Sequence, residues 1–136
     1  MKYVGGCCCG ALRYESSSPP EECGYCHCRL CQRTTAAPAT VFASFPVEDF
    51  HYSSGQPSIY QSSTTGNREY CSKCGTQIAF RGVGDVETVD VNVGSLDDPS
   101  IVSPEYHIWC QSQVDWFEVD DDLPRYQQGK PEDSGT

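Results

Sequence analysis

Seven of the chain's ten cysteines form three short clusters with the spacing of metal ligands. The clusters are Cys7 with Cys9, then Cys26, Cys28 and Cys31, then Cys71 with Cys74. A CxC or CxxC pair places two sulfurs on one tight turn, at the separation that two corners of a zinc tetrahedron require when Zn–S is about 2.3 Å. The first and third clusters together predict a structural zinc site. It would join segments about sixty residues apart and so stabilise the fold.

The second cluster predicts a catalytic zinc, because three protein ligands leave one coordination position open for water or substrate. Three thiolates give Zn²⁺ a net charge of about −1, which weakens the acidification of bound water and favours a thiol substrate as fourth ligand. Cys26, Cys28 and Cys31 are therefore the candidate catalytic residues.

Two other states of this cluster stay open. Cys23 or His27 could complete a closed structural site, although alternation along an extended segment turns His27 away from Cys26 and Cys28. A three-ligand site also loses metal more readily than a four-ligand one, so the second zinc is the more labile of the two. The three free thiols would then be reactive and oxidisable.

The elements that must position these clusters are mostly short strands. Residues 3–4 and 12–15 predict a hairpin with the first cysteine pair at its tip. Further strands are predicted where β-branched and aromatic residues run between turn residues, at 40–45, 50–52, 58–61, 77–81, 88–93 and 106–110. Residues 29–36, ended by Pro38, predict one short helix whose first turn carries the second cluster. The sequence thus predicts a mainly β fold of antiparallel sheets, with one short helix after the second cysteine cluster.

Length and charge narrow the class of protein. The 136 residues suit one zinc-binding domain over residues 1–126, followed by a flexible C-terminal tail over 127–136 that lacks an apolar anchor. Residues 85–136 hold two Lys or Arg against 13 Asp or Glu, and the net charge of −10 argues against nucleic acid as a partner. No membrane span or signal pattern is present, so we expect a cytoplasmic protein whose cysteines bind metal rather than form disulfides.

Seven motifs, three of them built on the cysteine clusters, carry a resemblance to a known family. They are Gly6-Cys7-x-Cys9-Gly10-Ala11-x-Arg13-Tyr14, Cys26-His27-Cys28-x-x-Cys31 and Tyr70-Cys71-x-x-Cys74-Gly75-Thr76-Gln77, followed by Gly94-Ser95-Leu96-Asp97, His107-Ile108-Trp109, Trp116 and Leu123-Pro124-Arg125-Tyr126. In this order they resemble the glutathione-dependent formaldehyde-activating enzyme and centromere protein V family over residues 5–126. The resemblance implies a β-tent around a structural four-cysteine zinc, with a three-cysteine zinc beside the substrate cleft. The implied activity is that of a carbon-sulfur lyase, which condenses glutathione with formaldehyde to S-hydroxymethylglutathione and catalyses the reverse reaction.

Glutathione would need cations in the protein, because it has two carboxylates and one ammonium and approaches a negatively charged metal site. Arg29 and Arg33 are the first candidates to bind it, with Arg68 and Arg81 behind them. His107 is a candidate proton carrier but is more simply a hydrogen-bonded structural residue, and His51 is a weaker candidate.

The remaining aromatic and acidic motifs are expected to be structural. Tyr106, Trp109, Trp116 and Phe117 are expected in the core rather than in a cleft wall. The acidic block of residues 120–122 is expected to form a solvated turn.

Two other functions fit the same sequence. One is a non-enzymatic zinc-binding module that contacts another protein through its acidic part. The other is a thiol redox sensor built on Cys23 and the second cluster. Two bound zinc ions per chain, one of them exchangeable, would favour the lyase.

Overall fold

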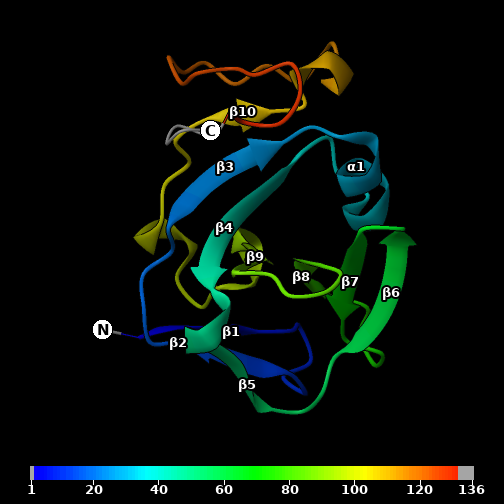
Figure 1. The fold of residues 1–136 in the computed structure, drawn as a ribbon, viewed down its shortest axis with the longest axis vertical. Helices are drawn as coiled ribbons and strands as arrows, with labels where there is room; N and C mark the ends of the chain where they lie inside the picture. Colours follow the sequence, from blue (N-terminus) through cyan, green and yellow to red (C-terminus); the bar gives the residue numbers. More distant parts are fainter. Residues whose placement is uncertain (1, 132–136) are drawn as a thin grey trace.

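The computed structural model describes residues 2–131, in which ten short strands form two sheets. The small sheet consists of β1 (Tyr3–Gly6), β2 (Arg13–Ser16) and β5 (Phe50–Ser54), in the order β1-β2-β5. The large sheet consists of β3 (Glu22–Cys26), β4 (Thr40–Pro46), β6 (Ser58–Ser63), β7 (Gly66–Tyr70), β8 (Gln77–Gly82), β9 (Thr88–Asn92) and β10 (His107–Ile108). Its order is β10-β3-β4-β9-β8-β7-β6. Figure 1 shows the small sheet below the curved large sheet, with β10 at the opposite end.

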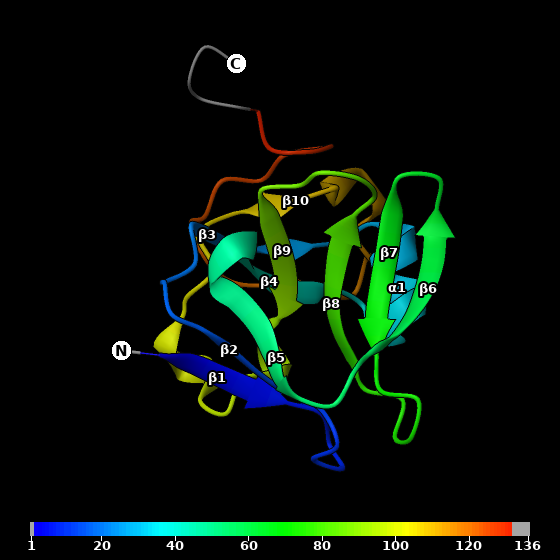
Figure 2. The ribbon, with the colours of Figure 1, turned by 60° about the horizontal axis from the view of Figure 1, so that its bottom comes forward.

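The only α-helix within residues 2–131 is α1 (Arg29–Thr35), which begins directly after Cys28 and carries Cys31 in its first turn, as expected. It ends because Ala36 adopts a left-handed conformation with φ of 53°. In Figure 2 the helix lies behind β7 and β6, so it covers one face of the large sheet at that end. Four short 3-10 helices complete the described elements: η1 (Val47–Asp49), η2 (Val93–Ser95), η3 (Pro99–Ile101) and η4 (Cys110–Ser112).

The mainly β fold is confirmed, and three details differ from expectation. Strands β3 and β7 are not predicted, because they contain Gly, Asn and charged residues that disfavour strands; each lies between two neighbours that supply ladder hydrogen bonds on both sides. Neighbouring strands are antiparallel except β10, which runs parallel to β3. The strand predicted at 106–110 is short, because Trp109 has a left-handed φ of 59° that turns the chain.

Alternation along β9 separates a core face of the large sheet from a cavity face. Val89 and Val91 are fully buried in a core that joins the two sheets, where Tyr14 of β2 also packs. Asp90 and Asn92 point to the opposite face, where both line a cavity. The face of the sheet that carries polar residues is therefore the one that α1 covers.

The segment after residue 126 begins in contact with the domain. The carbonyls of Gln127 and Gln128 accept hydrogen bonds from the backbone N–H groups of Gln111 (3.3 Å) and Trp109 (3.0 Å). Residues 132–136 of the predicted flexible tail lie outside the described residues. Among residues 2–131, no helix has the length and hydropathy needed to cross a membrane.

Candidate metal centres

The first and third cysteine clusters meet in space and form what we call the four-cysteine group. Cys7 and Cys9 lie in the turn between β1 and β2, and Cys71 and Cys74 lie in the turn between β7 and β8. All four Sγ atoms are within 4.8 Å of one another. Cys9 Sγ is 3.7 Å from Cys7 Sγ and 3.8 Å from Cys71 Sγ. A tetrahedron with metal–sulfur bonds of about 2.3 Å has edges of about 3.8 Å, so these sulfurs fit a four-coordinate zinc.

Both turns are built from local backbone hydrogen bonds and one left-handed glycine each. Gly10 (φ 83°) donates its N–H to the carbonyl of Cys7, and Gly75 (φ 81°) donates to the carbonyl of Cys71. A residue with a side chain is strained at such φ values, so glycine is required for each turn to close. Hydrogen bonds from the side chain and backbone of Thr76 lower the pKa of Cys74 to about 5, which makes its thiolate available to a metal at neutral pH.

Cys26, Cys28 and Cys31 form the three-cysteine group, with all Sγ atoms within 4.8 Å of one another. Cys26 ends β3, Cys28 caps α1, and Cys31 lies in the first turn of the helix, where its N–H donates to Cys28 Sγ at 3.3 Å. Hydrogen bonds with the side chains of Cys26 and Cys31 lower the pKa of Cys28. The hydrogen bond between Cys26 and Cys28 raises the pKa of Cys26. Within residues 2–131 neither Cys23 nor His27 joins this group.

The three-cysteine group opens into a cavity of about 480 Å³, which we call the thiol cavity. Its wall also includes Arg68, Phe80 and Asp90 from the covered face of the large sheet, and Trp109 from the segment after β10. The register β7-β8-β9 places Arg68 beside Phe80 and Phe80 beside Asp90, so one row of the sheet faces the sulfurs. An arginine and an aspartate therefore lie together in an otherwise largely apolar hollow.

Arg68 is the arginine whose guanidinium reaches the sulfurs. The side chain is buried, its Nη1 lies 3.6 Å from Cys31 Sγ, and its Nε donates to Ser62 Oγ at 3.0 Å. The guanidinium also stacks over the Phe80 ring at 4.7 Å. Sequence patterns rank Arg68 behind Arg29 and Arg33 because only the cross-strand register brings β7 next to the helix.

The other predicted cation and histidine positions differ in how they relate to the cavity. Arg29 lines the thiol cavity and donates to Gln32 Oε1 at 2.6 Å, whereas Arg33 lines an adjoining hollow that also contains Arg68. Arg81 lies against Glu69, with Nε to Oε2 at 2.7 Å, and His51 lies 3.6 Å from Glu15. Arg29 therefore lies at the thiol cavity, whereas Arg81 and His51 do not line it and are paired with Glu69 and Glu15.

His107 and the four aromatic residues expected in the core occupy different environments. His107 is fully buried in a hydrogen-bonded chain. Tyr106 is buried and Phe117 packs near His27, whereas Trp116 is 76% exposed and does not belong to the core. Trp109 lines the thiol cavity.

Asp90 is a site residue that sequence reasoning missed. Its Oδ1 accepts a hydrogen bond from Ser44 Oγ at 2.5 Å, and burial raises its pKa although this hydrogen bond acts in the opposite direction. Glu22, which also raises the pKa, and Arg68, which lowers it, are the charged groups nearby. The alternation of Val89, Asp90, Val91 and Asn92 was the available signal, since it marks a polar face opposite a buried one.

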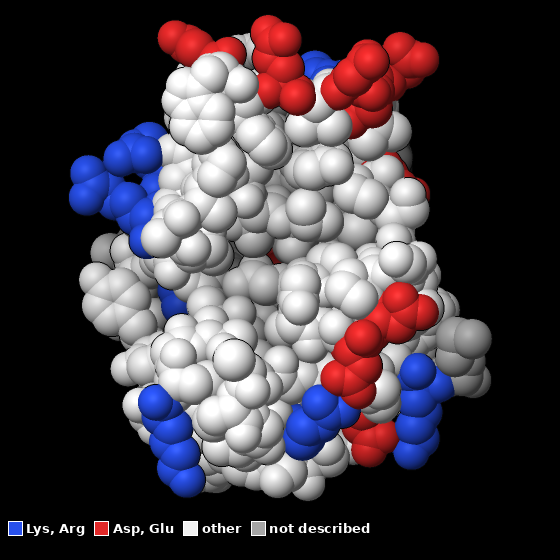
Figure 3. Space-filling model, turned by 180° about the vertical axis from the view of Figure 1, so that it is seen from behind, with Lys and Arg blue, Asp and Glu red and all other residues white. Residues whose placement is uncertain are grey.

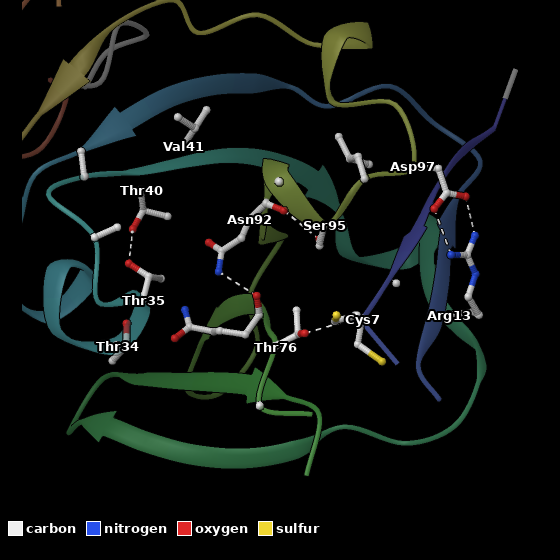
Figure 4. A pocket seen from close by; sticks show the side chains of 18 residues that line it. Cys7, Arg13, Thr34, Thr35, Thr40, Val41, Thr76, Asn92, Ser95 and Asp97 are labelled. Atoms are coloured by element: carbon white, nitrogen blue, oxygen red, sulfur yellow. Dashed lines mark hydrogen bonds and ion pairs between the residues drawn. The ribbon is translucent and has the colours of Figure 1, made fainter. Parts of the chain in front are cut away.

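A wider hollow of about 750 Å³ joins the surroundings of the two groups (Figure 4). Cys7 and Thr76 line it beside the four-cysteine group, and Thr35 lines it beside α1. Thr40 and Asn92 belong to both this hollow and the thiol cavity, so the two spaces adjoin. Figure 3 shows Asp and Glu gathered at the end where β10 lies, and a hollowed surface of mostly uncharged residues between the two ends.

Comparisons with known proteins agree with this architecture. The model of the family "Glutathione-dependent formaldehyde-activating enzyme" matches residues 2–112. A Halomonas elongata protein, named provisionally as a glutathione-dependent formaldehyde-activating enzyme, is 26% identical over 129 residues, which cover 88% of this chain and 82% of that protein. A crystal structure of a Rhodobacter sphaeroides protein superposes with a TM-score of 0.58 at 25% identity, covering 92% of this chain and 99% of that one. The family match spans both cysteine groups and most of the chain, and the chain therefore belongs to the glutathione-dependent formaldehyde-activating enzyme family.

Proposed function

We propose that the protein is a zinc-dependent carbon-sulfur lyase that forms or cleaves a thiol–aldehyde adduct such as S-hydroxymethylglutathione. The observation that carries this proposal is the three-cysteine group at the wall of the thiol cavity, with no fourth protein ligand among residues 2–131. Such a donor set leaves room for a substrate sulfur. The family match adds glutathione and formaldehyde as the expected substrates.

The proposal includes two zinc ions per chain. Cys7, Cys9, Cys71 and Cys74 would hold a structural ion, and Cys26, Cys28 and Cys31 would hold the catalytic one. When bound there, zinc lowers the pKa of a thiol and holds it as thiolate at the cavity wall.

Asp90 supplies the proton in this proposal. As the adduct forms, the thiol sulfur bonds to the aldehyde carbon, the C=O π electrons move to oxygen, and the Asp90 carboxyl donates its proton to that oxygen. The thiol has already lost its proton to solvent, and solvent returns one to Asp90. In the cleavage direction Asp90 takes the hydroxyl proton back. Its raised pKa supports this role, because raising the pKa of a carboxyl group increases the fraction that can donate a proton at a given pH.

The arginines orient the anionic substrate. Arg68 lies beside Cys31 and offsets the negative charge that three thiolates and an incoming thiol bring together. Arg29 and Arg33 are exposed on α1, at the thiol cavity and the adjoining hollow, and would bind the carboxylates of glutathione. The wider hollow offers room for the remainder of a tripeptide.

Magnetisation-exchange NMR of glutathione with formaldehyde tests the proposal. The protein should accelerate interconversion of free and adduct forms, and Cys28→Ser should abolish the acceleration. Cys8→Ser is the matched control, because Cys8 is exposed and belongs to neither group. Equal exchange with wild type, with Cys28→Ser and without protein would exclude the lyase. One zinc ion per chain and no acceleration would instead favour a zinc-binding module or a redox sensor.

A further inference from the structure

A hydrogen-bonded chain of three side chains runs from the C-terminal segment to the loop between Cys26 and Cys28. Asp121 Oδ2 lies 3.1 Å from His107 Nε2, and His107 Nδ1 lies 2.9 Å from His27 Nε2. Both imidazoles are fully buried. We propose that Asp121 is a positioning residue for the three-cysteine group and acts through His107 and His27.

The direction of the hydrogen bonds follows from the two ends of the chain. His27 Nδ1 is buried and has no hydrogen-bond partner, so it carries no proton. The ring proton of His27 is therefore on Nε2, which donates to His107 Nδ1. His107 accepts at Nδ1 and donates through Nε2 to Asp121, because an ionised carboxylate only accepts. Asp121 thus selects one tautomer for each ring.

His27 connects Asp121 and His107 to the cysteines, because every polar group of His27 except Nδ1 is hydrogen-bonded. Its N–H donates to the carbonyl of Ile108 at 3.0 Å, and its carbonyl accepts from Gln32 Nε2 of α1 at 2.9 Å. Tyr25, which precedes Cys26, stacks on His107 with ring centroids 4.4 Å apart and planes 7° apart. The residues on both sides of Cys26 are therefore bound to the same buried ring system.

Asp121 is itself held in place, unlike its acidic neighbours. Arg125 lies 3.0 Å from Asp121 Oδ1 and donates to the carbonyls of Leu123 (2.9 Å) and Val119 (2.7 Å). Asp120 and Asp122 are exposed, so the expectation of a solvated turn is correct for them and wrong for Asp121. Asp121 also lies beyond residue 112, where the match to the family model ends. The C-terminal segment thus supports the metal loop from outside the matched region.

The expected effect is on the affinity of one site. Partners that orient a metal site from outside its ligands change metal affinity by about 10- to 100-fold when they are removed. Because Asp121 acts through two intervening rings, we expect Asp121→Ala to lower zinc affinity at the three-cysteine group by about 10-fold. Asp121→Asn keeps an acceptor oxygen of the same shape and should restore part of the loss. Asp122→Ala removes the same charge from the same turn and should have no effect.

The test is a competition between the zinc-loaded protein and a chromophoric chelator, which resolves the two ions of each chain by affinity. Asp121→Ala should lower the affinity only for the more weakly bound zinc ion. When Co²⁺ replaces zinc at that site, the visible spectrum of the variant should differ from that of wild type. The tighter ion reports the four-cysteine group in the same molecules. Equal loss at both sites would mean general destabilisation and would overturn the proposal, as would wild-type affinity in Asp121→Ala.

The inference rests on the catalytic zinc of the proposed function and not on the lyase reaction. If wild type binds one zinc ion only, the zinc assignment and this inference fail together. If two ions bind but glutathione exchange is absent, the lyase proposal fails while the result for Asp121 still stands.

Discussion

Removing the metal from the four-cysteine group should lower the free energy of unfolding by about 4 kcal/mol. Cys9 and Cys71 are 62 residues apart in the chain. An unfolded chain can bind zinc through the same four sulfurs only by closing this loop, and the chain-entropy relation for a cross-link of that length gives about 4 kcal/mol at 25 °C. The native fold already holds the two turns together, so bound zinc favours it by about this amount.

The double variant Cys71→Ser/Cys74→Ser removes one half of the group and leaves the β1–β2 hairpin unchanged. With a urea m value of about 2 kcal/mol/M, the unfolding midpoint should fall by about 2 M. Trp109 and Trp116 provide fluorescence probes for the transition. A strong zinc chelator should shift the wild-type midpoint in the same direction and should have little effect on the variant.

Cys8→Ser is the control, because Cys8 lies in the same turn but its exposed thiol is outside the group. Its midpoint should stay within about 0.25 M of wild type, since surface substitutions usually change the free energy of unfolding by no more than about 0.5 kcal/mol. Identical midpoints for wild type, chelated wild type and the double variant would refute the reasoning, because they would mean that no metal bridges the two turns.

Three further predictions concern the thiol cavity and the sheet beneath it. Asp90→Asn cannot donate a proton and should slow glutathione–formaldehyde exchange by about 100-fold. Because burial raises the pKa of Asp90, the wild-type rate should fall as pH rises through that raised pKa, and this fall should be absent in the variant; an unchanged pH profile by NMR would rule out the proton-donor role. Arg29→Gln and Arg33→Gln should each raise the KM for glutathione by up to about fivefold with kcat unchanged, because exposed ion pairs contribute at most about 1 kcal/mol; a lower kcat at constant KM would contradict a purely binding role. Gly66→Ala should lower stability by about 1–3 kcal/mol in urea unfolding, because a Cβ there would overlap the ring of Phe80; a wild-type midpoint would show that the ring moves aside freely.

Local spacing made the metal groups predictable from the sequence. CxC, CxxC and a following glycine define tight turns by themselves, because each turn involves only neighbouring residues. The structure brings together the same sulfurs that the spacing selects. The short helix after Cys28 and the first hairpin are predictable for the same reason, since their hydrogen bonds close within a few residues.

Contacts between distant strands were decided only by the tertiary structure. Arg68 reaches Cys31 and Asp90 faces the thiol cavity because the register of the large sheet aligns them with Phe80. Strands β7, β8 and β9 are consecutive, but the row lies against the cysteines only because β9 pairs with β4, the strand that follows α1. A long connection separates β4 from β9, and no local pattern encodes that pairing.

The chain from Asp121 to His27 depends on the parallel pairing of β10 with β3, which joins residues about eighty positions apart. The sequence by itself therefore determined which sulfurs can hold metal. The tertiary structure decided which charged and polar side chains surround them, because those side chains come together only when the sheet has formed.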